Sequence, residues 1–367
     1  MAATTPAPTA PASPTTPTTP TESASPTAPA SPIAPTAPVA PTGPVATDDE
    51  FLEVVSPFRR ELLAHCYRML GSVHEAEDLV QETYLRAWRS YHGFEGRSSL
   101  RTWLYRIATN ACLTALDSRN RRPLPTGLGG PASDPSDPLE QAEILWLEPV
   151  PDALVGGDPN DPATVVTARS TVRLALVAAR QHLPPRQRAT LVLREVMQVP
   201  AAEVAEMLGT TVAAVNSSLQ RARAQLDAMD VSEDDVVEPD DPAQRALLDH
   251  YVRALEAKDV GRIVEAFTAD AVWEMPPFTS WYRGAEAIGR LVGEHCPAAP
   301  GDLLSLPTRA NGGQPAFAVY LRGRDGWEPF QLQVLTVSDG RISHVAAFFD
   351  TTLFGIFGLP ARLPLAA

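Results

Sequence analysis

The stretch EVAEMLGTTVAAVNSSLQRARAQL, residues 203–226, has the pattern of two short helices joined by a turn. Gly209 supplies the turn, because glycine adopts backbone conformations that are costly for other residues. Ala205 is small at the point where the two helices would cross. The expected packing set is Val204, Leu208, Val212, Val215 and Leu219. We therefore predict a helix-turn-helix, with a first helix over 201–208 and a second that starts near residue 212.

The second helix of this motif is predicted to present a polar face without acids. No acidic residue precedes Asp227 in it, which suits an approach to phosphate. Arginine can bridge O6 and N7 of guanine, and asparagine or glutamine can bridge adenine. The predicted outward residues are Thr211, Ala214, Asn216, Ser217, Gln220, Arg221 and Arg223. The alternative is an ordinary helical hairpin, which the small crossing residue, the glycine turn and the acid-free face argue against.

The charge of the whole chain opposes an approach to phosphate, since the formal net charge is -14 over 367 residues. This length suits two or three domains, and a hydrophobic content of 44% can fill their cores. No apolar run reaches transmembrane length, and the N-terminus lacks the basic start and apolar core of a secretory signal. We therefore expect a cytoplasmic protein that does not engage membranes.

The sequence predicts no metal site and no cofactor. The cysteines, Cys66, Cys112 and Cys296, are scattered without metal-ligand spacing. We interpret them as small buried hydrophobic residues in a reducing compartment.

Composition divides the chain into seven segments. Residues 1–48 are almost entirely Ala, Pro, Thr and Ser, cannot bury enough apolar surface to repay ordering, and are expected to be disordered. The remaining segments follow from helical periodicity and from acidic or Pro/Gly-rich breaks. They are a helical unit at 49–122, an acidic linker at 123–165 with one helical turn around 144–147, a second helical unit at 166–229, an acidic linker at 230–242, a mixed domain at 243–350 and a tail at 351–367.

The mixed domain is predicted to be α+β, with helices on one side of a curved antiparallel sheet. Asp339-Gly340 between two alternating runs is a strong hairpin signal. The expected helices are Ala243–Ala257, Val260–Phe267 and Gly284–His295, and the expected strands are Ala271–Met275, Ala316–Arg322, Phe330–Ser338 and Arg341–Phe349.

Two stretches of the first helical unit are candidate binding surfaces. The helix predicted over 75–91 has an aromatic stripe, and Asp78, Gln81 and Glu82 lie opposite it. They form either a solvated acidic face or a docking surface for a basic partner. The run over 94–122 then mixes aromatic residues with arginines, which suits melted DNA, because bases stack and phosphates pair. Its members are Phe94, Trp103, Tyr105, Arg97, Arg101, Arg106, Arg119, Arg121 and Arg122.

At these residues the chain resembles the extracytoplasmic-function sigma factors of bacteria, over about residues 50–228. DLVQETYLRAW (78–88) is similar to region 2.2, which binds the clamp helices of the β′ subunit of RNA polymerase. FEGRSSLRTWLYRIATNACL (94–113) is similar to regions 2.3 and 2.4, which open and read the −10 element. LPPRQRATLVLREV (183–196) together with the helix-turn-helix resembles region 4, which reads the −35 element. The resemblance implies a non-enzymatic transcription-initiation factor whose partners are core RNA polymerase and promoter DNA.

The resemblance also implies roles for individual residues. Asp78, Gln81 and Glu82 would face the polymerase clamp. The loop Phe94–Ser99, including Arg97 and Ser98, would hold a flipped −10 base together with Asn110, and Trp103, Arg119, Arg121 and Arg122 would contribute to −10 binding. Asn216, Ser217, Gln220 and Arg221 would read −35 bases, Thr211 would contribute to −35 binding, and Arg186 and Arg223 would contact phosphate. On the helix over 183–196, Arg186, Arg188 and Arg194 are predicted to lie outward, where they could touch phosphate or equally be solvated charges.

One departure from the family weakens the expected grip on DNA. Family members commonly carry Arg or Lys at the positions of Asn216 and Ser218, so region 4 is expected to bind promoter DNA poorly alone. The two basic patches are local, and polymerase would supply the remaining attraction. We expect the acidic linker at 123–165 to thread a basic polymerase channel.

Residues 243–350 resemble the SnoaL-like, NTF2-like cone fold, which implies a pocket. Candidate lining residues are Trp273, Glu274, Trp281, His295 and Asp350, with Tyr282 and His344 nearby. No base with an oriented partner is evident, so we expect no catalytic residue and favour a regulatory domain that senses a small ligand. The alternative is a SnoaL-like isomerase or cyclase with a DNA-binding appendage; a dimeric repressor is a weaker rival, because no dimerisation helix is evident.

Overall fold

The computed structural model describes residues 47–117, 121–155, 170–229 and 241–365. The tail predicted at 1–48 therefore lies almost wholly outside the described residues, as do Arg119 and most of the linker predicted at 230–242. None of the described helices is both long and apolar enough to cross a membrane.

Four helices build the first unit: α1 (Asp48–Val55), α2 (Arg59–Leu70), α3 (Val73–Ser90) and α4 (Leu100–Asp117). Ser72 caps α3 by accepting a hydrogen bond from the Glu75 amide, and Gly71 ends α2 with a left-handed φ of 73°. The predicted helix over 75–91 is thus confirmed to within two residues. The apolar stripes of α3 and α4 pack into one core with α2, where Cys66 and Cys112 are free and buried.

The helix-turn-helix is α9 (Ala201–Met207) and α10 (Val212–Asp227). It follows α7 (Leu174–Arg180), α8 (Pro185–Leu191) and a π-helical segment, Val192–Val196. Gly209 has a φ of 59°, and the Thr210 amide bonds the Ala205 carbonyl at 2.8 Å, which closes the turn. One packing residue was predicted wrongly: Val212 is 44% exposed, because it occupies the first position of α10, beyond the helix crossing.

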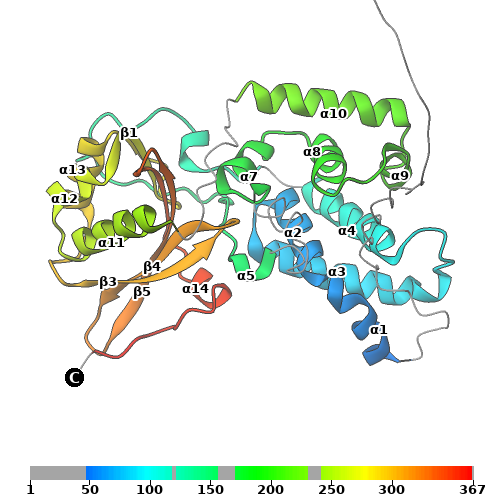
Figure 1. The fold of residues 1–367 in the computed structure, drawn as a ribbon, viewed down its shortest axis with the longest axis horizontal. Helices are drawn as coiled ribbons and strands as arrows, with labels where there is room; N and C mark the ends of the chain where they lie inside the picture. The colour runs from blue at the N-terminus through cyan, green and yellow to red at the C-terminus, as the bar shows by residue number, and fades with distance from the viewer. Residues whose placement is uncertain (1–46, 118–120, 156–169, 230–240, 366–367) are drawn as a thin grey trace, which may run out of the picture. The chain divides into compact units, whose positions relative to one another are not determined.

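The C-terminal unit is a six-stranded sheet covered on one face by helices α11 (Pro242–Glu256), α12 (Val260–Glu265) and α13 (Ala285–His295), as Figure 1 shows. The strand order is β2-β1-β6-β5-β4-β3. The strands are β1 (Phe267–Glu274), β2 (Trp281–Arg283), β3 (Leu303–Ala310), β4 (Gln314–Arg322), β5 (Trp327–Ser338) and β6 (Arg341–Phe348).

The α+β prediction is confirmed, with corrections in detail. β1 and β6 are parallel, so the sheet is mixed rather than antiparallel. Strands β2 and β3 were not predicted, because β2 has three residues and β3 carries Pro307, which is typical of an edge strand. The predicted hairpin at Asp339-Gly340 is confirmed: both residues have positive φ, and Ser338 pairs with Arg341.

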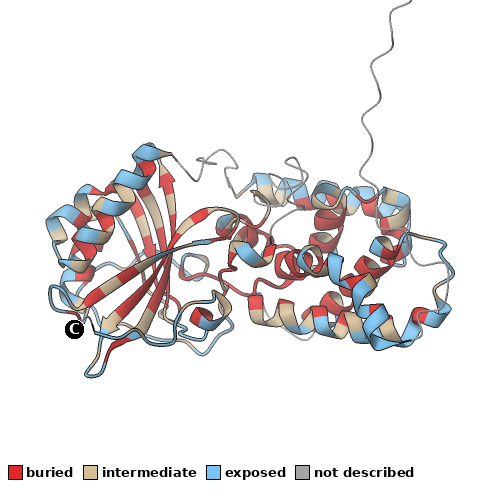
Figure 2. Cartoon of the chain, turned by 60° about the horizontal axis from the view of Figure 1, so that its bottom comes forward, coloured by how far each residue is buried: buried red, intermediate tan, exposed pale blue. Residues whose placement is uncertain are grey.

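Each face of the sheet has its own core, and parts of β4, β5 and β6 are therefore buried continuously along the strand (Figure 2). One face, with Trp273, Phe317 and Val345, packs against α11, α12 and α13. The opposite face, with Ala318, Ala346 and Phe348, belongs to the same core as the first helical unit. The predicted tail also contributes to this core through α14 (Leu353–Ile356), in which Leu353 and Phe354 are buried.

The predicted helical turn around 144–147 is absent, and helical turns lie instead at Pro125–Gly127 and at α5 (Asp152–Val155). Ile144 and Leu145 are exposed, whereas Leu147 and Val150 are buried in the core. The linker is therefore anchored in the core through Leu147 and Val150 of a segment that has no helical structure.

Candidate functional site

Helix α3 exposes the three polar residues selected from the sequence. Asp78 and Gln81 are exposed, and among the described residues neither has a hydrogen-bond or ion-pair partner. Glu82 accepts a 2.7 Å bond from Arg86 Nε one turn later. Leu85, which lies one turn beyond Gln81 and Glu82, is 50% exposed. Sequence reasoning missed Leu85, although an apolar residue at i+4 on a polar helix face is a signal of a docking surface.

The loop between α3 and α4 is open to solvent. Arg97 has 87% of its side chain exposed, and Gly96 turns the backbone with a φ of 66°. Ser99 accepts from the Thr102 amide at 3.0 Å and so fixes the start of α4. Asn110 is exposed on α4, whereas Phe94 and Ser98 are half-buried.

Trp103 was predicted to contribute to −10 binding, and the structure places its side chain in the core rather than at the surface. The indole is buried, with its ring 4.9 Å from Phe94 and 6.2 Å from Tyr91. It supports the loop from beneath, because its position on α4 belongs to the apolar stripe.

Arg122, also predicted to contribute to −10 binding, is buried in this structure. Only 7% of it is exposed, and it pairs with Glu75 at 2.8 Å and Glu148 at 3.6 Å. A guanidinium in this setting keeps its charge by replacing water with carboxylates, so it is not available to phosphate. Arg121 is exposed but donates to His182 Nδ1 and to the Gly127 carbonyl.

Helix α10 exposes the residues selected for −35 binding, which are Thr211, Asn216, Ser217, Gln220, Arg221 and the candidate phosphate contact Arg223. Thr211 caps the helix by accepting from the Ala214 amide, and Arg221 donates to Ser217 Oγ at 2.7 Å. Arg223 forms an ion pair with Glu195. The α10 side chains are thus held on one face by local contacts.

Helix α8 carries two arginines, Arg186 and Arg188, that were both predicted to lie outward but have different surroundings in the structure. Arg186 is exposed and donates to the Leu208 carbonyl at 3.2 Å. Arg188, predicted to lie outward, is only 2% exposed. It donates to the carbonyls of Met69, Gln181 and Leu183 and to Gln181 Oε1, so a region 4 arginine caps the C-terminal end of α2. Burial lowers the pKa of Arg188 to about 10, so the side chain remains a cation near neutrality.

The five residues proposed for a C-terminal pocket do not gather in one cavity. Trp273 faces the core beneath the helices, whereas its neighbour Glu274 lies on the opposite face of β1, since successive strand residues alternate. Glu274 accepts from the Thr126 amide at 3.0 Å and lies 2.7 Å from His344 Nε2. Trp281 Nε1 donates to the Gly129 carbonyl at 2.9 Å.

The other two candidates also have structural partners. His295 Nε2 lies 2.8 Å from the Pro135 carbonyl, and Asp350 accepts from Thr352. Contacts from the linker or from the chain's own turns thus replace the predicted pocket, and sequence spacing gives no sign of them.

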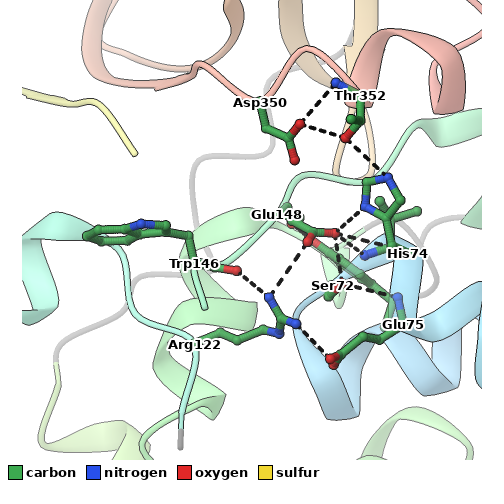
Figure 3. Close-up of polar contacts among 10 residues, drawn as sticks. Ser72, His74, Glu75, Arg122, Trp146, Glu148, Asp350 and Thr352 are labelled. Atoms are coloured by element: carbon green, nitrogen blue, oxygen red, sulfur yellow. Dashed lines mark hydrogen bonds and ion pairs between the residues drawn. The ribbon is translucent and has the colours of Figure 1, made fainter. Parts of the chain in front are cut away.

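Glu148 of the linker connects three parts of the chain (Figure 3). Its carboxylate accepts from the Ser72 hydroxyl at 2.8 Å and the Val73 amide at 3.0 Å, which adds a negative charge at the N-terminus of α3. His74 Nδ1 lies 3.0 Å from the same oxygen. Its Nε2 lies 3.4 Å from the hydroxyl of Thr352, which follows β6 in the chain.

The turn between β3 and β4 binds region 2, the linker and the start of region 4 at once. Asn311, fully buried, donates through Nδ2 to Tyr67 Oη at 2.7 Å and to the Val172 carbonyl at 2.8 Å. Its Oδ1 accepts from the Val150 amide at 3.2 Å. Gln314 Oε1 accepts from the Leu174 amide at 2.9 Å, where α7 begins.

Comparison with known families matches three parts of this chain. Residues 54–122 match Sigma-70 region 2, residues 173–226 match Sigma-70, region 4, and residues 248–345 match the SnoaL-like domain.

Whole-chain relatives agree with these matches. The ECF RNA polymerase sigma factor SigG of Mycobacterium tuberculosis is 59% identical over 317 residues, which cover 86% of this chain and 85% of the relative. SigJ of the same organism is 31% identical over 300 residues, 77% of this chain and 86% of the relative. The crystal structure of Mycobacterium tuberculosis SigJ has the same fold, with a TM-score of 0.54, 24% identity, and coverage of 84% of this chain and 99% of that one. The chain therefore belongs to the ECF RNA polymerase sigma factors, which direct transcription initiation, and it carries sigma regions 2 and 4 followed by a SnoaL-like domain.

Proposed function

We propose that this sigma factor docks on the β′ clamp helices of core RNA polymerase through one face of α3, formed by Asp78, Gln81, Glu82 and Leu85. The observation that carries the proposal is an exposed leucine beside acidic and amide groups of which Asp78 and Gln81 have no partner among the described residues. An apolar centre with a polar rim is the composition of a protein interface.

A pull-down of core RNA polymerase tests this docking face. The double variant Asp78→Arg/Glu82→Arg should lose polymerase that the wild type retains. Asp249→Arg/Asp270→Arg, which makes the same charge change at two exposed positions of the SnoaL-like domain, is the control. Equal retention by both double variants would move the docking face elsewhere.

The promoter would be read by two separate surfaces. The loop Phe94–Ser99 with Asn110 would hold a base flipped from the −10 element, since the loop is open to solvent and Asn110 is exposed on α4. The face of α10 with Asn216, Gln220 and Arg221 would enter the major groove at the −35 element.

The SnoaL-like domain would modulate initiation by holding regions 2 and 4 together. The turn at Asn311 supports this role, because one buried amide side chain bonds groups from region 2, the linker and the start of region 4. Elements named −35 and −10 lie about 25 bp, or roughly 85 Å, apart on B-DNA at about 3.4 Å per base pair. Regions 2 and 4 in direct contact cannot span that distance, so this arrangement represents a closed state.

A small-molecule ligand of this domain would bind away from the residues first proposed. Between α11 and strands β3 and β4 lies a cavity of about 360 Å³, with Leu248 and Phe317 on its apolar side and Arg245 and Arg309 at its polar side. Asp249 also lines the cavity, whose volume suits a small organic molecule. A thermal-shift screen of small aromatic and aliphatic molecules, with Leu248→Trp as the filled-cavity control, tests the assignment; a ligand that stabilises both proteins equally would place the site elsewhere.

A further inference from the structure

The linker of regions 2 and 4 is bound along the SnoaL-like domain by a series of specific contacts. Glu274 accepts from the Thr126 amide, Trp281 Nε1 donates to the Gly129 carbonyl, and the Ala132 amide donates to the Trp281 carbonyl at 2.8 Å. The linker is thus recognised mainly through its backbone, at three positions three residues apart.

These contacts continue towards both edges of the sheet. Gln141 forms an antiparallel bridge with Phe278, just before edge strand β2, and Pro151 forms another with Ala310 at the end of edge strand β3. Added backbone pairing at a sheet edge is a common mode of peptide recognition. The SnoaL-like domain therefore binds the segment 126–151 as it would bind an extended peptide.

Polar side chains of the linker between residues 134 and 152 also have partners within the chain. Arg290 donates to Asp134 Oδ1 at 2.7 Å and to Ser136 Oγ at 2.9 Å. Glu148 accepts from Ser72 and His74 of region 2, and Asp152 accepts from the Gly312 amide at 2.7 Å. Three acidic groups that would attract a basic polymerase channel are therefore already bound within the chain.

We propose that the SnoaL-like domain and core RNA polymerase compete for this linker, so that its release from the sheet edges is a required step of polymerase binding. The inference rests on the proposed function, because it assumes that polymerase uses the linker acids. Release would also lengthen the connection between regions 2 and 4. The 26 residues 126–151 can extend by up to about 85 Å at about 3.3 Å per residue, which matches the separation of the two promoter elements.

A disulfide that locks the linker in place tests the competition in the full chain. The variant Gln141→Cys/Phe278→Cys joins the partners of the first bridge, and the control Ser338→Cys/Arg341→Cys staples a hairpin of the same domain away from the linker. Mass spectrometry verifies each disulfide before affinity for core polymerase is measured with and without reductant. We expect the oxidised lock to bind about tenfold more weakly than its reduced form, within the usual range of coupling between sites. The control should not change.

A loosened linker gives the opposite test. The double variant Trp281→Phe/Arg290→Ala removes the indole and guanidinium contacts and should bind polymerase more tightly than wild type, while Arg253→Ala, at an exposed position of α11, should not. Equal affinity of the locked and reduced chains, or an unchanged affinity of the loosened variant, would overturn the competition. If the reduced chains and the wild type fail to bind polymerase at all, the proposed docking itself fails, which is a different result.

Discussion

At the scale of single residues, burial divides the arginines of the sigma regions into two kinds. Arg97, Arg186 and Arg221 are exposed on the candidate DNA surfaces. Arg122 and Arg188 are buried, one between carboxylates and the other among carbonyl and amide oxygens. A buried guanidinium is costly unless hydrogen bonds replace its hydration, so the second kind stabilises contacts between segments.

Arg188→Ala should weaken the contact between regions 2 and 4. The change leaves the Met69 and Gln181 carbonyls without their donor in a buried setting, at a cost of about 2–4 kcal/mol. Chemical denaturation of the purified chain measures the loss. Arg186→Ala, on the same helix with a single bond to the Leu208 carbonyl, should cost less than about 1 kcal/mol. Equal losses would show that the burial of Arg188 has no special role.

His65 gives region 2 a sensitivity to acid. It is fully buried against Thr109, and burial, helped by Arg68 and Arg101, lowers its pKa to about 3. The unfolded chain takes up this proton near the usual value of 6.5 and the folded chain does not, so stability should fall as pH drops below about 6.5. The decline is at most about 1.4 kcal/mol per pH unit.

The variant His65→Gln keeps a group that can bond Thr109 but does not titrate. Unfolding free energies of both proteins between pH 7 and about pH 4 measure the contribution of His65. The wild type should lose more stability over this range than the variant. Parallel pH profiles would contradict the assignment.

At the scale of elements, each of the two candidate recognition helices, α3 and α10, packs against the core through the face opposite its candidate binding face. Helix α10 buries Val215, Leu219 and Ala222 and leaves its remaining sides to solvent. Helix α3 buries Ala76, Val80 and Ala87 and exposes Leu85. These faces could be predicted from the sequence, because the periodicity of its apolar residues indicates which side of a helix is buried. The same periodicity predicts an inward position for Trp103, but a tryptophan on an arginine-rich helix suits both base stacking and packing, so the sequence did not choose between these two roles.

Arg221→Ala should relax base preference at one position of the −35 element. The arginine is exposed, and its bond to Ser217 holds it along the polar face of α10. Loss of a bidentate base contact costs about 1–3 kcal/mol for the preferred base and little for the others. In vitro initiation from promoters that vary in each −35 base measures this difference. A uniform loss on all promoters would identify Arg221 as a phosphate contact instead.

At the scale of the whole molecule, the described sigma regions and the SnoaL-like domain share one apolar core. Leu147 and Val150 of the linker lie in it together with Tyr67 of α2 and Ala318 of β4. The polar contacts at Asn311 and Glu148 lie in the same interface and give it directional specificity. The C-terminal domain is therefore packed against the sigma regions through the face of its sheet that its own helices leave uncovered.

Asn311→Gly should shift the chain towards an open form. Glycine tolerates the left-handed φ of 50° at this position, so the variant removes the side-chain bonds to Tyr67, Val150 and Val172 without straining the turn. We expect a larger radius of gyration by small-angle scattering and higher initiation at limiting polymerase. Asp339→Gly, at the left-handed hairpin position of β5 and β6, is the matched control. A radius unchanged from wild type would exclude this turn as the holding contact.

The sequence by itself determined the family, the order of the units, the helix-turn-helix and the exposed faces of α3 and α10, because these depend on local periodicity and on contiguous motifs. Only the tertiary structure decided what the linker does. Its partners, Glu274, Trp281, Arg290 and Asn311, lie more than 100 residues away along the chain, and most of them bind backbone groups that every residue possesses. The same reason explains why Arg188 is buried and Arg186 is exposed. Arg188 contacts Met69 of the distant helix α2, and the spacing of the two arginines along α8 does not predict this contact.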